Sequence, residues 1–511
     1  MKIWYPIFCC FFSCSLFAQT TDSLDLSGDF LLKEIVRGQD GPVVVKVNRR
    51  FEPTELMLEA MDAELQTTAE RRLSLVQDSM LIEVEAVFYW NDRLNVLTST
   101  YFREKGRYAL VLHQFGYPNL QKIATVLVHE PFIPPTAVAP FDYAISPDSS
   151  KLLVATWAYA LATDPLRMNV AVFDREMTRV RDDRILLPYT NERAYVAGIE
   201  VGNDASFSMM LENYTGKVSQ WSNMSVTRVD HFLLAFGEDS SEPVQYDLVL
   251  PEKHVPTQYS LTTDPTGKIV LGGFYRKRNR LDWAGAFWMQ VDPVTQRSRK
   301  RVFPIERTSF REAYGGPRAD LEAPRHILKD YQMQHIFTDA SANTYLLAER
   351  TFVRSESSFQ MYVESGEYSH AEDVLVYRIS PMGDLVYQTR LPKQQRSHML
   401  FDHMLSYQPM EHKGRLYLLY NDVPDNYRDR LNLKKITPFE GKNSLPVLAE
   451  VDARGDFRFI LLNRISHPDL VPRPALSLDL HEGRMLFYEE DPLLSFRYQF
   501  GLIDIGEGFT R

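Results

Sequence analysis

A cluster of cationic side chains in the stretch YRKRNRLDW is the first candidate for chemistry in this chain. Its members are Arg276, Lys277, Arg278 and Arg280, with Trp283 at its end. Guanidinium groups bind carboxylates, sulfates and phosphates through paired hydrogen bonds, so the cluster suits an anionic glycan or a phosphate-rich partner. A solvated hairpin loop kept soluble by its charges is the favoured alternative. The basic run RSRKR (297–301) follows, and we expect it to extend the same surface.

A second candidate is the long, Gly- and Pro-rich loop REAYGGPRADLEAPRH (311–326), which has mixed charge. Long loops on a rigid scaffold commonly carry function. Tyr314, Arg318 and Arg325 could therefore line the mouth of a central opening in the fold. A plain connection between structural units explains the same composition and is the favoured reading.

Histidines and carboxylates gather in HMLFDHMLSYQPMEH, which contains His398, His403 and His412 with Asp402 and Glu411. Such ligands bind zinc, but the spacing is not that of a helical HExxH site. On a strand, His398 and His403 would face opposite sides. We therefore expect solvated loop histidines, no metal site and no cofactor. No nucleophile elbow, phosphate-binding loop or dinucleotide fingerprint occurs in the sequence, so catalytic residues stay unassigned.

The composition is that of a folded globular protein. Of the 511 residues, 44% are hydrophobic and 24% charged, which argues against disorder. The formal net charge of −10 makes a broad surface for nucleic acid improbable. We expect a glycan or an envelope protein as the partner rather than a nucleic acid.

The N-terminus is typical of an export signal. Lys2 precedes an apolar run (3–17) and then the small residue Ala18, after which we expect cleavage. The run is short for a membrane span, so a retained anchor is the weaker alternative. All three cysteines lie within residues 1–18, so no structural disulfide is expected after processing. Lipidation at Cys14 is disfavoured by the residues before it. Periplasm, outer-membrane periphery and medium all remain open, and no later segment is long enough to span a membrane.

The remaining chain is a series of hairpins. The stretch AISPDSSKLLVATW (144–157) reads as strand, turn and strand, and similar units recur. The seven candidate inner hairpins lie at 84–102, 144–157, 198–214, 260–275, 335–352, 407–422 and 476–491. More polar hairpins, such as 169–188 and 286–304, lie between them.

Two hairpins per unit give four antiparallel strands, which is the blade of a β-propeller. The sequence therefore predicts an all-β propeller, with seven blades favoured and six or eight possible. An N-terminal strand that completes the last blade would close the ring and remove its free edges. The expected organisation is a leader (1–18), a loose segment (19–41) and one propeller (42–511). Two tandem sandwiches are a weaker alternative, and residues 54–75 fit either a short helix or a strand with a loop.

Three stretches carry a resemblance to a known family. They are EDVLVYRISPMGDLVYQTRLPKQQ (372–395), GRLYLLYNDVPDN (414–426) and LAEVDARGDFRFILLNR (448–464). These motifs resemble the large secreted proteins of Bacteroidota-type bacteria that have no assigned function. The resemblance covers about half of the chain beyond the leader, and it implies a secreted β-rich protein without implying an activity.

We expect from these features an exported, non-enzymatic propeller that serves as a binding or assembly module at the cell envelope. The alternative is a polysaccharide-active hydrolase or lyase with its site on one face of the propeller. A small-molecule or metal-dependent hydrolase with ligands near the axis is a third candidate.

Overall fold

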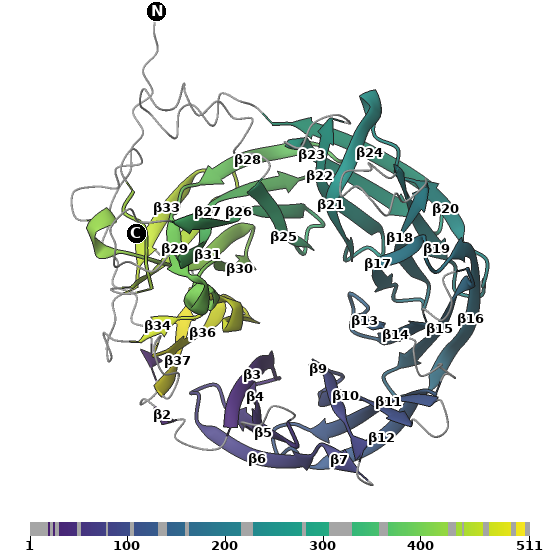
Figure 1. Ribbon diagram of the computed structural model, residues 1–511, viewed down its shortest axis with the longest axis horizontal. Coiled ribbons are helices and arrows are strands. Elements are labelled where there is room, and N and C mark those ends of the chain that lie inside the picture. Colours follow the sequence, from purple (N-terminus) through teal and green to yellow (C-terminus); the bar gives the residue numbers. More distant parts are fainter. Residues whose placement is uncertain are drawn as a thin grey trace, which may run out of the picture.

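The structure, a computed structural model, describes most of the chain. The described residues are 19–20, 24–25, 30–48, 53–77, 80–102, 107–130, 140–158, 163–215, 228–277, 283–305, 330–356, 366–427, 436–441, 444–462, 470–491 and 497–505. Within them, eight antiparallel sheets of four to six strands are arranged as a ring (Figure 1). The protein is therefore an eight-bladed β-propeller.

Each of the first four blades has four strands in sequential order, with the first strand nearest the axis of the ring (Figure 1). Blade 1 contains β3 (Phe30–Arg37), β4 (Pro42–Asn48), β5 (Glu55–Met61) and β6 (Thr67–Ser74). Blade 2 contains β9 (Glu83–Trp90), β10 (Arg93–Phe102), β11 (Arg107–Gly116) and β12 (Lys122–His129). Blade 3 contains β13 (Phe141–Ile145), β14 (Lys151–Ala158), β15 (Pro165–Asp174) and β16 (Arg179–Thr190). Blade 4 contains β17 (Ala194–Val201), β18 (Phe207–Thr215), β19 (Arg228–Phe236) and β20 (Val244–Asp247).

Blades 5 to 7 repeat this order, and blade 6 gains a fifth strand. Blade 5 contains β21 (His254–Thr263), β22 (Ile269–Lys277), β23 (Trp283–Asp292) and β24 (Arg297–Pro304). Blade 6 contains β25 (Tyr331–Thr338), β26 (Thr344–Glu356), β27 (Gly366–Ile379), β28 (Leu385–Leu391) and β29 (Gln395–His398). Blade 7 contains β30 (Tyr407–His412), β31 (Arg415–Asp422), β32 (Leu445–Val451) and β33 (Phe457–Leu461).

Short elements connect or flank these blades. They are the pair β7 (Val76–Gln77) and β8 (Met80–Leu81), and the 3₁₀ turns η2 (Pro251–Lys253), η4 (Met399–Met404), η5 (Pro424–Asn426) and η6 (Pro474–Leu476).

Blade 8 is built from both ends of the described chain. It contains β34 (Val471–Pro472), β35 (Leu478–His481), β36 (Arg484–Glu490) and β37 (Arg497–Asp504). The N-terminal strands β1 (Gln19–Thr20) and β2 (Leu24–Asp25) pair antiparallel with β37. The expected closure of the last blade by an N-terminal strand is therefore confirmed.

Strands near the middle of each blade are apolar on both faces because each blade is covered by a neighbour on either side. In β14, Leu152 and Val154 pack toward blade 2, whereas Leu153 and Ala155 pack toward blade 4. This explains why KLLVATW reads as a continuous apolar run rather than as an alternating one.

An apolar cluster fills each of the eight seams between neighbouring blades. The seam between blades 8 and 1 is filled by Val44 and Met61 from blade 1 with Leu486, Tyr488 and Phe500 from blade 8. The last blade thus packs on the first, and burial of apolar surface drives closure of the ring as it drives packing of the other seams.

The number of blades and the start of the propeller differ from the favoured expectations. The favoured number of blades was seven, and the structure has eight. The additional inner hairpin is β3–β4, and β3 (Phe30–Arg37) lies in a segment that we expected to be loose. The propeller therefore begins before Pro42. Of the two readings of residues 54–75, the structure supports the strand, because this stretch forms β5 and β6.

The turn within 144–157 is stabilised by local side-chain hydrogen bonds. The Oγ of Ser146 accepts hydrogen bonds from the backbone N–H groups of Ser150 and Lys151, and it donates one to Asp148. These residues serve the turn, as expected of Ser and Asp between two strands.

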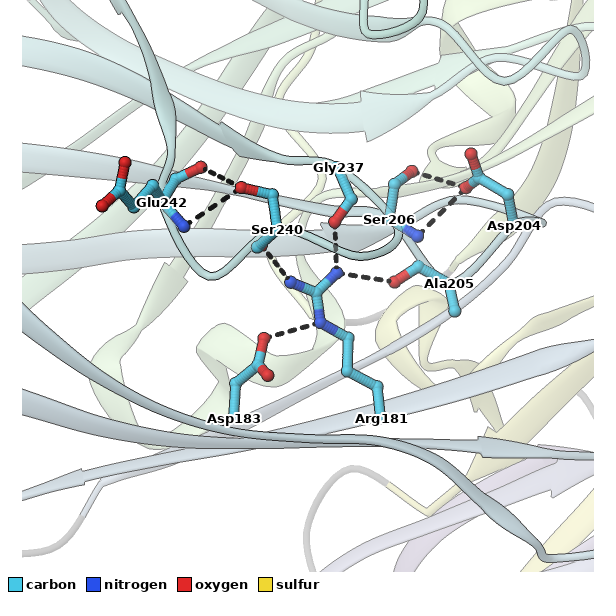
Figure 2. Close-up of polar contacts among 8 residues, drawn as sticks. All are labelled: Arg181, Asp183, Asp204, Ala205, Ser206, Gly237, Ser240 and Glu242. Carbon is cyan, nitrogen blue, oxygen red and sulfur yellow. Dashed lines mark hydrogen bonds and ion pairs between the residues drawn. The ribbon is translucent and has the colours of Figure 1, made fainter.

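A buried arginine joins blade 3 to blade 4 (Figure 2). The guanidinium of Arg181, on β16, donates to the carbonyls of Ala205, Gly237 and Ser240 at 3.2, 2.7 and 2.5 Å. Its Nε lies 2.6 Å from a carboxylate oxygen of Asp183. One planar side chain thereby satisfies carbonyls from two turns of blade 4, which a lysine could not do in the same geometry.

Candidate functional site

The structure describes three of the residues of the predicted basic surface, namely Arg276, Lys277 and Trp283. Trp283 is 4% exposed and its ring stacks on Phe274, with centroids 4.1 Å apart. It belongs to the apolar seam between blades 5 and 6, so it is a core residue and not a binding aromatic. Arg276 is half-buried and Lys277 is exposed, both at the end of β22. Arg278, Arg280, Tyr314, Arg318 and Arg325 lie outside the described residues.

The two basic stretches do not form one surface. Arg276 pairs with Trp283 at one end of β23, whereas Arg297 pairs with Asp292 at the other end. Ten residues of strand separate these ends by about 30 Å. The expectation that 297–301 extends the Arg276 cluster is therefore wrong.

The histidine-rich segment is dispersed over three elements. His398 lies against the ring of Tyr368, and Nε2 of His403 lies 3.2 Å from a carboxylate oxygen of Glu490. His412 ends β30, next to the turn into β31. In the described parts of the chain, no three His, Cys, Asp or Glu side chains converge as metal ligands.

A polar cavity lies between the innermost strands of blades 4, 5 and 6. Its volume is about 610 Å³. Its lining comes from β17, β21 and β25, and consists of Glu200, 258–262 and 332–336. Gln258, Ser260, Thr262, Gln332 and Gln334 contribute amides and hydroxyls. This lining presents many neutral hydrogen-bonding groups and few charges, which is the composition expected of a site for a neutral or weakly charged polar molecule.

Glu200 is the acidic group of this lining. Burial, together with the charge of Asp142 on blade 3, raises the pKa of its carboxyl to about 8. The hydroxyl of Thr263 lies 3.5 Å from Oε2 of Glu200. Because the Glu200 carboxyl is mostly protonated at pH 7, it can donate a proton to a bound molecule.

Asp142, on β13 of the adjacent blade, is the carboxylate whose charge acts on Glu200. Burial also raises the pKa of Asp142, while a hydrogen bond from the N–H of Tyr143 lowers it. Two carboxyls that share an environment in this way tend to divide their roles, one remaining protonated and the other ionised. Asp142 is not part of the cavity lining, so it sets the charge around Glu200 without contacting the cavity.

A hydrogen-bonded network lies behind Tyr259, which also lines the cavity. The hydroxyl of Tyr259 donates to the carboxylate of Glu212 and lies 3.0 Å from Nδ1 of His231. The hydroxyl of Tyr214 donates to the other oxygen of Glu212 at 2.6 Å. Burial lowers the pKa of His231, which leaves the imidazole neutral, and it raises the pKa of Tyr259. The network fixes a neutral phenol at the wall of the cavity.

Exposed aromatic surface adjoins this network. Tyr195, which pairs with Glu212 across the β17–β18 hairpin, is 54% exposed, and Tyr214 is 36% exposed. His335 lines the cavity from β25, and burial lowers its pKa to about 4, so it too is neutral at pH 7. The cavity therefore combines amides, hydroxyls, neutral rings and one protonated carboxyl.

These residues were not among the predicted site residues. Glu200 is a single carboxylate in GIEVGND, and nothing in that string distinguishes it from the many other acidic residues. Its pKa is raised by burial and by the charge of Asp142 on blade 3, so only the assembled ring reveals it.

The fold class can be compared with known proteins. The chain matches no protein-family model and no curated protein. Among solved structures it is similar to the β-propeller domain of the Trilobed protease from Pyrococcus furiosus, with 10% identity over 82% of this chain and 93% of that chain and a TM-score of 0.34. Polysaccharide lyase Uly1 shares 8% identity over 95% of this chain and 100% of that chain, with a TM-score of 0.41. The GH93 α-L-arabinofuranosidase of Fusarium graminearum, in complex with arabinobiose, shares 9% identity over 65% of this chain and 93% of that chain, with a TM-score of 0.35.

These similarities concern the propeller architecture and assign no activity to this chain. In the part of the chain that the structure describes, no helix is long and apolar enough to cross a membrane.

Proposed function

We propose that this protein is a polysaccharide-active enzyme in which Glu200 protonates the oxygen of the glycosidic bond that breaks. The observation that carries the proposal is the raised pKa of Glu200, about 8, at the wall of a polar cavity. An alkoxide is a poor leaving group at neutral pH, so cleavage of a glycosidic bond benefits from a carboxylic acid that is still protonated there.

The lining of the cavity supports a sugar chain as the substrate. Sugars are bound by arrays of amides and hydroxyls together with aromatic rings, and the lining supplies Gln258, Gln332 and Tyr259 for these roles. The exposed rings of Tyr195 and Tyr214 offer further surface for an extended chain. Hydrolases and lyases both require protonation of the leaving oxygen, so the role of Glu200 is shared by the two reactions.

We also propose that the protein is exported and meets its glycan at the cell envelope or beyond it. Cleavage after Ala18 would leave Gln19, the first residue of β1, at the new N-terminus. The strand that closes blade 8 would then be retained. N-terminal sequencing of the secreted or periplasmic protein tests this directly, and a mature chain that starts within or after β2 would contradict it.

A non-enzymatic binding module is the second candidate. It is favoured by the fact that Glu200 is the single carboxylate on the cavity lining. Hydrolysis by a pair of carboxylates requires a second one across the bond, which the described lining does not supply.

The test is a panel of neutral and acidic polysaccharides incubated with the wild type, with Glu200→Gln and with Glu83→Gln. Glu83 is an exposed carboxylate on the inner strand of blade 2, so it serves as the control. We expect the wild type and Glu83→Gln to release reducing ends, and Glu200→Gln to lose at least about 100-fold of this activity.

The products separate the two reactions. A lyase leaves an ultraviolet-absorbing double bond in the new non-reducing sugar, and a hydrolase does not. Saturable binding without cleavage by the wild type would establish the binding module instead. Equal cleavage by Glu200→Gln and the wild type would show that Glu200 is not the proton donor.

A further inference from the structure

The outer strand of blade 5 carries a row of cations that the cavity does not use. In β24, which begins RSRKR, four of the first five residues are basic: Arg297, Arg299, Lys300 and Arg301. The three arginines are exposed. Figure 1 shows β24 at the outer rim of the ring, far from the inner strands that form the cavity.

The geometry of β24 aligns the arginines. Because alternate residues of a strand face the same side, Arg297, Arg299 and Arg301 form one row with a spacing of about 6.7 Å. β24 is the last strand of its sheet and pairs only with β23 in the described chain. Its other edge has no strand partner among the described residues.

The row is not neutralised by the protein itself. Among the described residues, no carboxylate forms an ion pair with any of the four cations. Nζ of Lys300 donates instead to the carbonyls of Asp247 and Val249, and Nη1 of Arg299 lies 3.3 Å from the sulfur of Met382. Elsewhere, exposed arginines such as Arg107 and Arg454 do have carboxylate partners.

A turn of blade 6 contacts the side chain of Arg301. Gly383 has φ +85°, and a Cβ there would lie 2.6 Å from the ring of Trp288 and 3.2 Å from Cγ of Arg301. The aliphatic part of the Arg301 side chain therefore lies beside Gly383, which has no side chain, and Arg301 as a whole is exposed. This contact places Arg301 beside the seam between blades 5 and 6.

Protection of a free sheet edge is a simpler role for charges on an outer strand. The outer strands of blades 1 and 3 also carry charges, but of both signs, as in TTAERRLS and RVRDDRIL. Charges of both signs are enough to protect a free sheet edge from pairing with another strand. A row of one sign without partners adds a field that attracts anions.

We propose that β24 binds an acidic polysaccharide along the row formed by Arg297, Arg299 and Arg301. A linear polymer with a carboxylate or sulfate at regular intervals can engage successive guanidinium groups. A peptide strand added to this edge would need pockets for alternate side chains, but the exposed side chains from 297 to 301 are polar or cationic.

This inference goes beyond the proposed function and does not depend on it, because the row and the cavity lie on different strands. The experiment measures binding to immobilised polygalacturonate, dextran sulfate and neutral dextran at several salt concentrations. The Glu200→Gln background removes any cleavage, so failure of one proposal does not obscure the other.

The test variant is Arg297→Gln/Arg299→Gln/Arg301→Gln. The control is Arg72→Gln/Arg107→Gln/Arg454→Gln, which removes the same charge from exposed arginines that have carboxylate partners. We expect the test variant to bind an acidic polymer at least about tenfold more weakly, with a shallower dependence on salt, while the control binds as the parent does. Circular dichroism and thermal unfolding verify that both variants are folded.

Several outcomes would overturn the inference. These are no binding of the parent protein to either acidic polymer, equal weakening in the test variant and the control, or binding to neutral dextran of the same strength. Arginine-dependent binding to poly-glutamate or to phosphatidylserine vesicles that is as tight as binding to the polysaccharides would overturn the assignment of the partner.

Discussion

Nζ of Lys393 lies 2.6 Å from a carboxylate oxygen of Glu349, and both side chains are completely buried. Lys393 also donates to the carbonyl of Ala371 and to the side chain of Gln395, and the other oxygen of Glu349 accepts from Ser406. Gln395 in turn donates to the carbonyl of Asn421. This network joins blades 6 and 7 through charged and polar groups, in addition to the apolar cluster that fills their seam.

Loss of one partner of this pair should be costly. Lys393→Met leaves the Glu349 carboxylate buried without a counter-charge, so we expect the free energy of unfolding to fall by about 3–5 kcal/mol. The double variant Lys393→Met/Glu349→Leu should recover most of this loss. Urea denaturation measures both, with Arg454→Gln as an exposed control that changes stability by less than about 0.5 kcal/mol. Equal stability of Lys393→Met and the wild type would show that the pair does not stabilise the fold.

The same network explains what the family-like motifs do. LPKQQ supplies Lys393 and Gln395, and the YND motif supplies Asn421, whose amide donates to the carbonyls of Met404 and Pro472. These motif residues are buried and bonded to one another or to the backbone. The motifs therefore report how blades 6, 7 and 8 are joined, and membership of the secreted family stays a prediction.

The stability of the fold should also depend on the planar guanidinium group of Arg181. Arg181→Lys keeps the charge but cannot donate to the carbonyls of Ala205, Gly237 and Ser240 at once (Figure 2). We expect a loss of about 2–3 kcal/mol, because buried carbonyls lose their donors. Arg184→Lys, at an exposed arginine of the same strand, is the matched control and should cost less. Chemical denaturation measures both variants. Equal stability of the two would contradict the role of Arg181 in joining blades 3 and 4.

Removal of the closing strands should weaken blade 8. A mature chain that starts after Asp25 loses the four cross-strand residue pairs that β1 and β2 form with β37. We expect the free energy of unfolding to fall by about 1–4 kcal/mol, the sum of four cross-strand pairs. Hydrogen exchange should then rise first in β37. Unchanged exchange there would show that the N-terminal strands do not close the ring.

The sequence predicted the blades better than it predicted the site, and the reasons are physical. Seven inner hairpins are recognisable because buried runs such as KLLVATW flank turns with Asp, Asn, Pro or Gly. The eighth, β3–β4, was missed because β3 (FLLKEIVR) carries Lys33 and Glu34 among its apolar residues. Strands that line the axis are half exposed, so their pattern is weaker.

A short stretch of sequence does not show which side chains become buried between neighbouring blades. Trp283 looked like a binding aromatic beside basic residues, but it packs inside the seam between blades 5 and 6. Glu200 looked ordinary, but it lines a cavity made by three blades. Both outcomes depend on which strands the ring brings together.

The pKa of Glu200 also predicts how stability changes with pH. Its folded-state pKa is raised from 4.5 to about 8, so the folded protein holds a proton that the unfolded chain releases between these values. Stability should therefore decrease as pH rises from about 4.5 to about 8 because of this group. Glu200→Gln removes this contribution, so the difference in unfolding free energy between variant and wild type should grow in favour of the variant across that window. A constant difference would contradict the raised pKa.

The most direct test of the proposed function is the pH dependence of kcat/KM on the best substrate of the polysaccharide panel. With Glu200 as the proton donor, activity should be retained up to about pH 7 and fall above it with an apparent pKa near 8, as the carboxyl ionises. Glu200→Gln should lack this limb together with most of the activity, while Glu83→Gln keeps both. A wild-type profile that stays level through pH 9, or the same alkaline limb in Glu200→Gln, would contradict the assignment of Glu200.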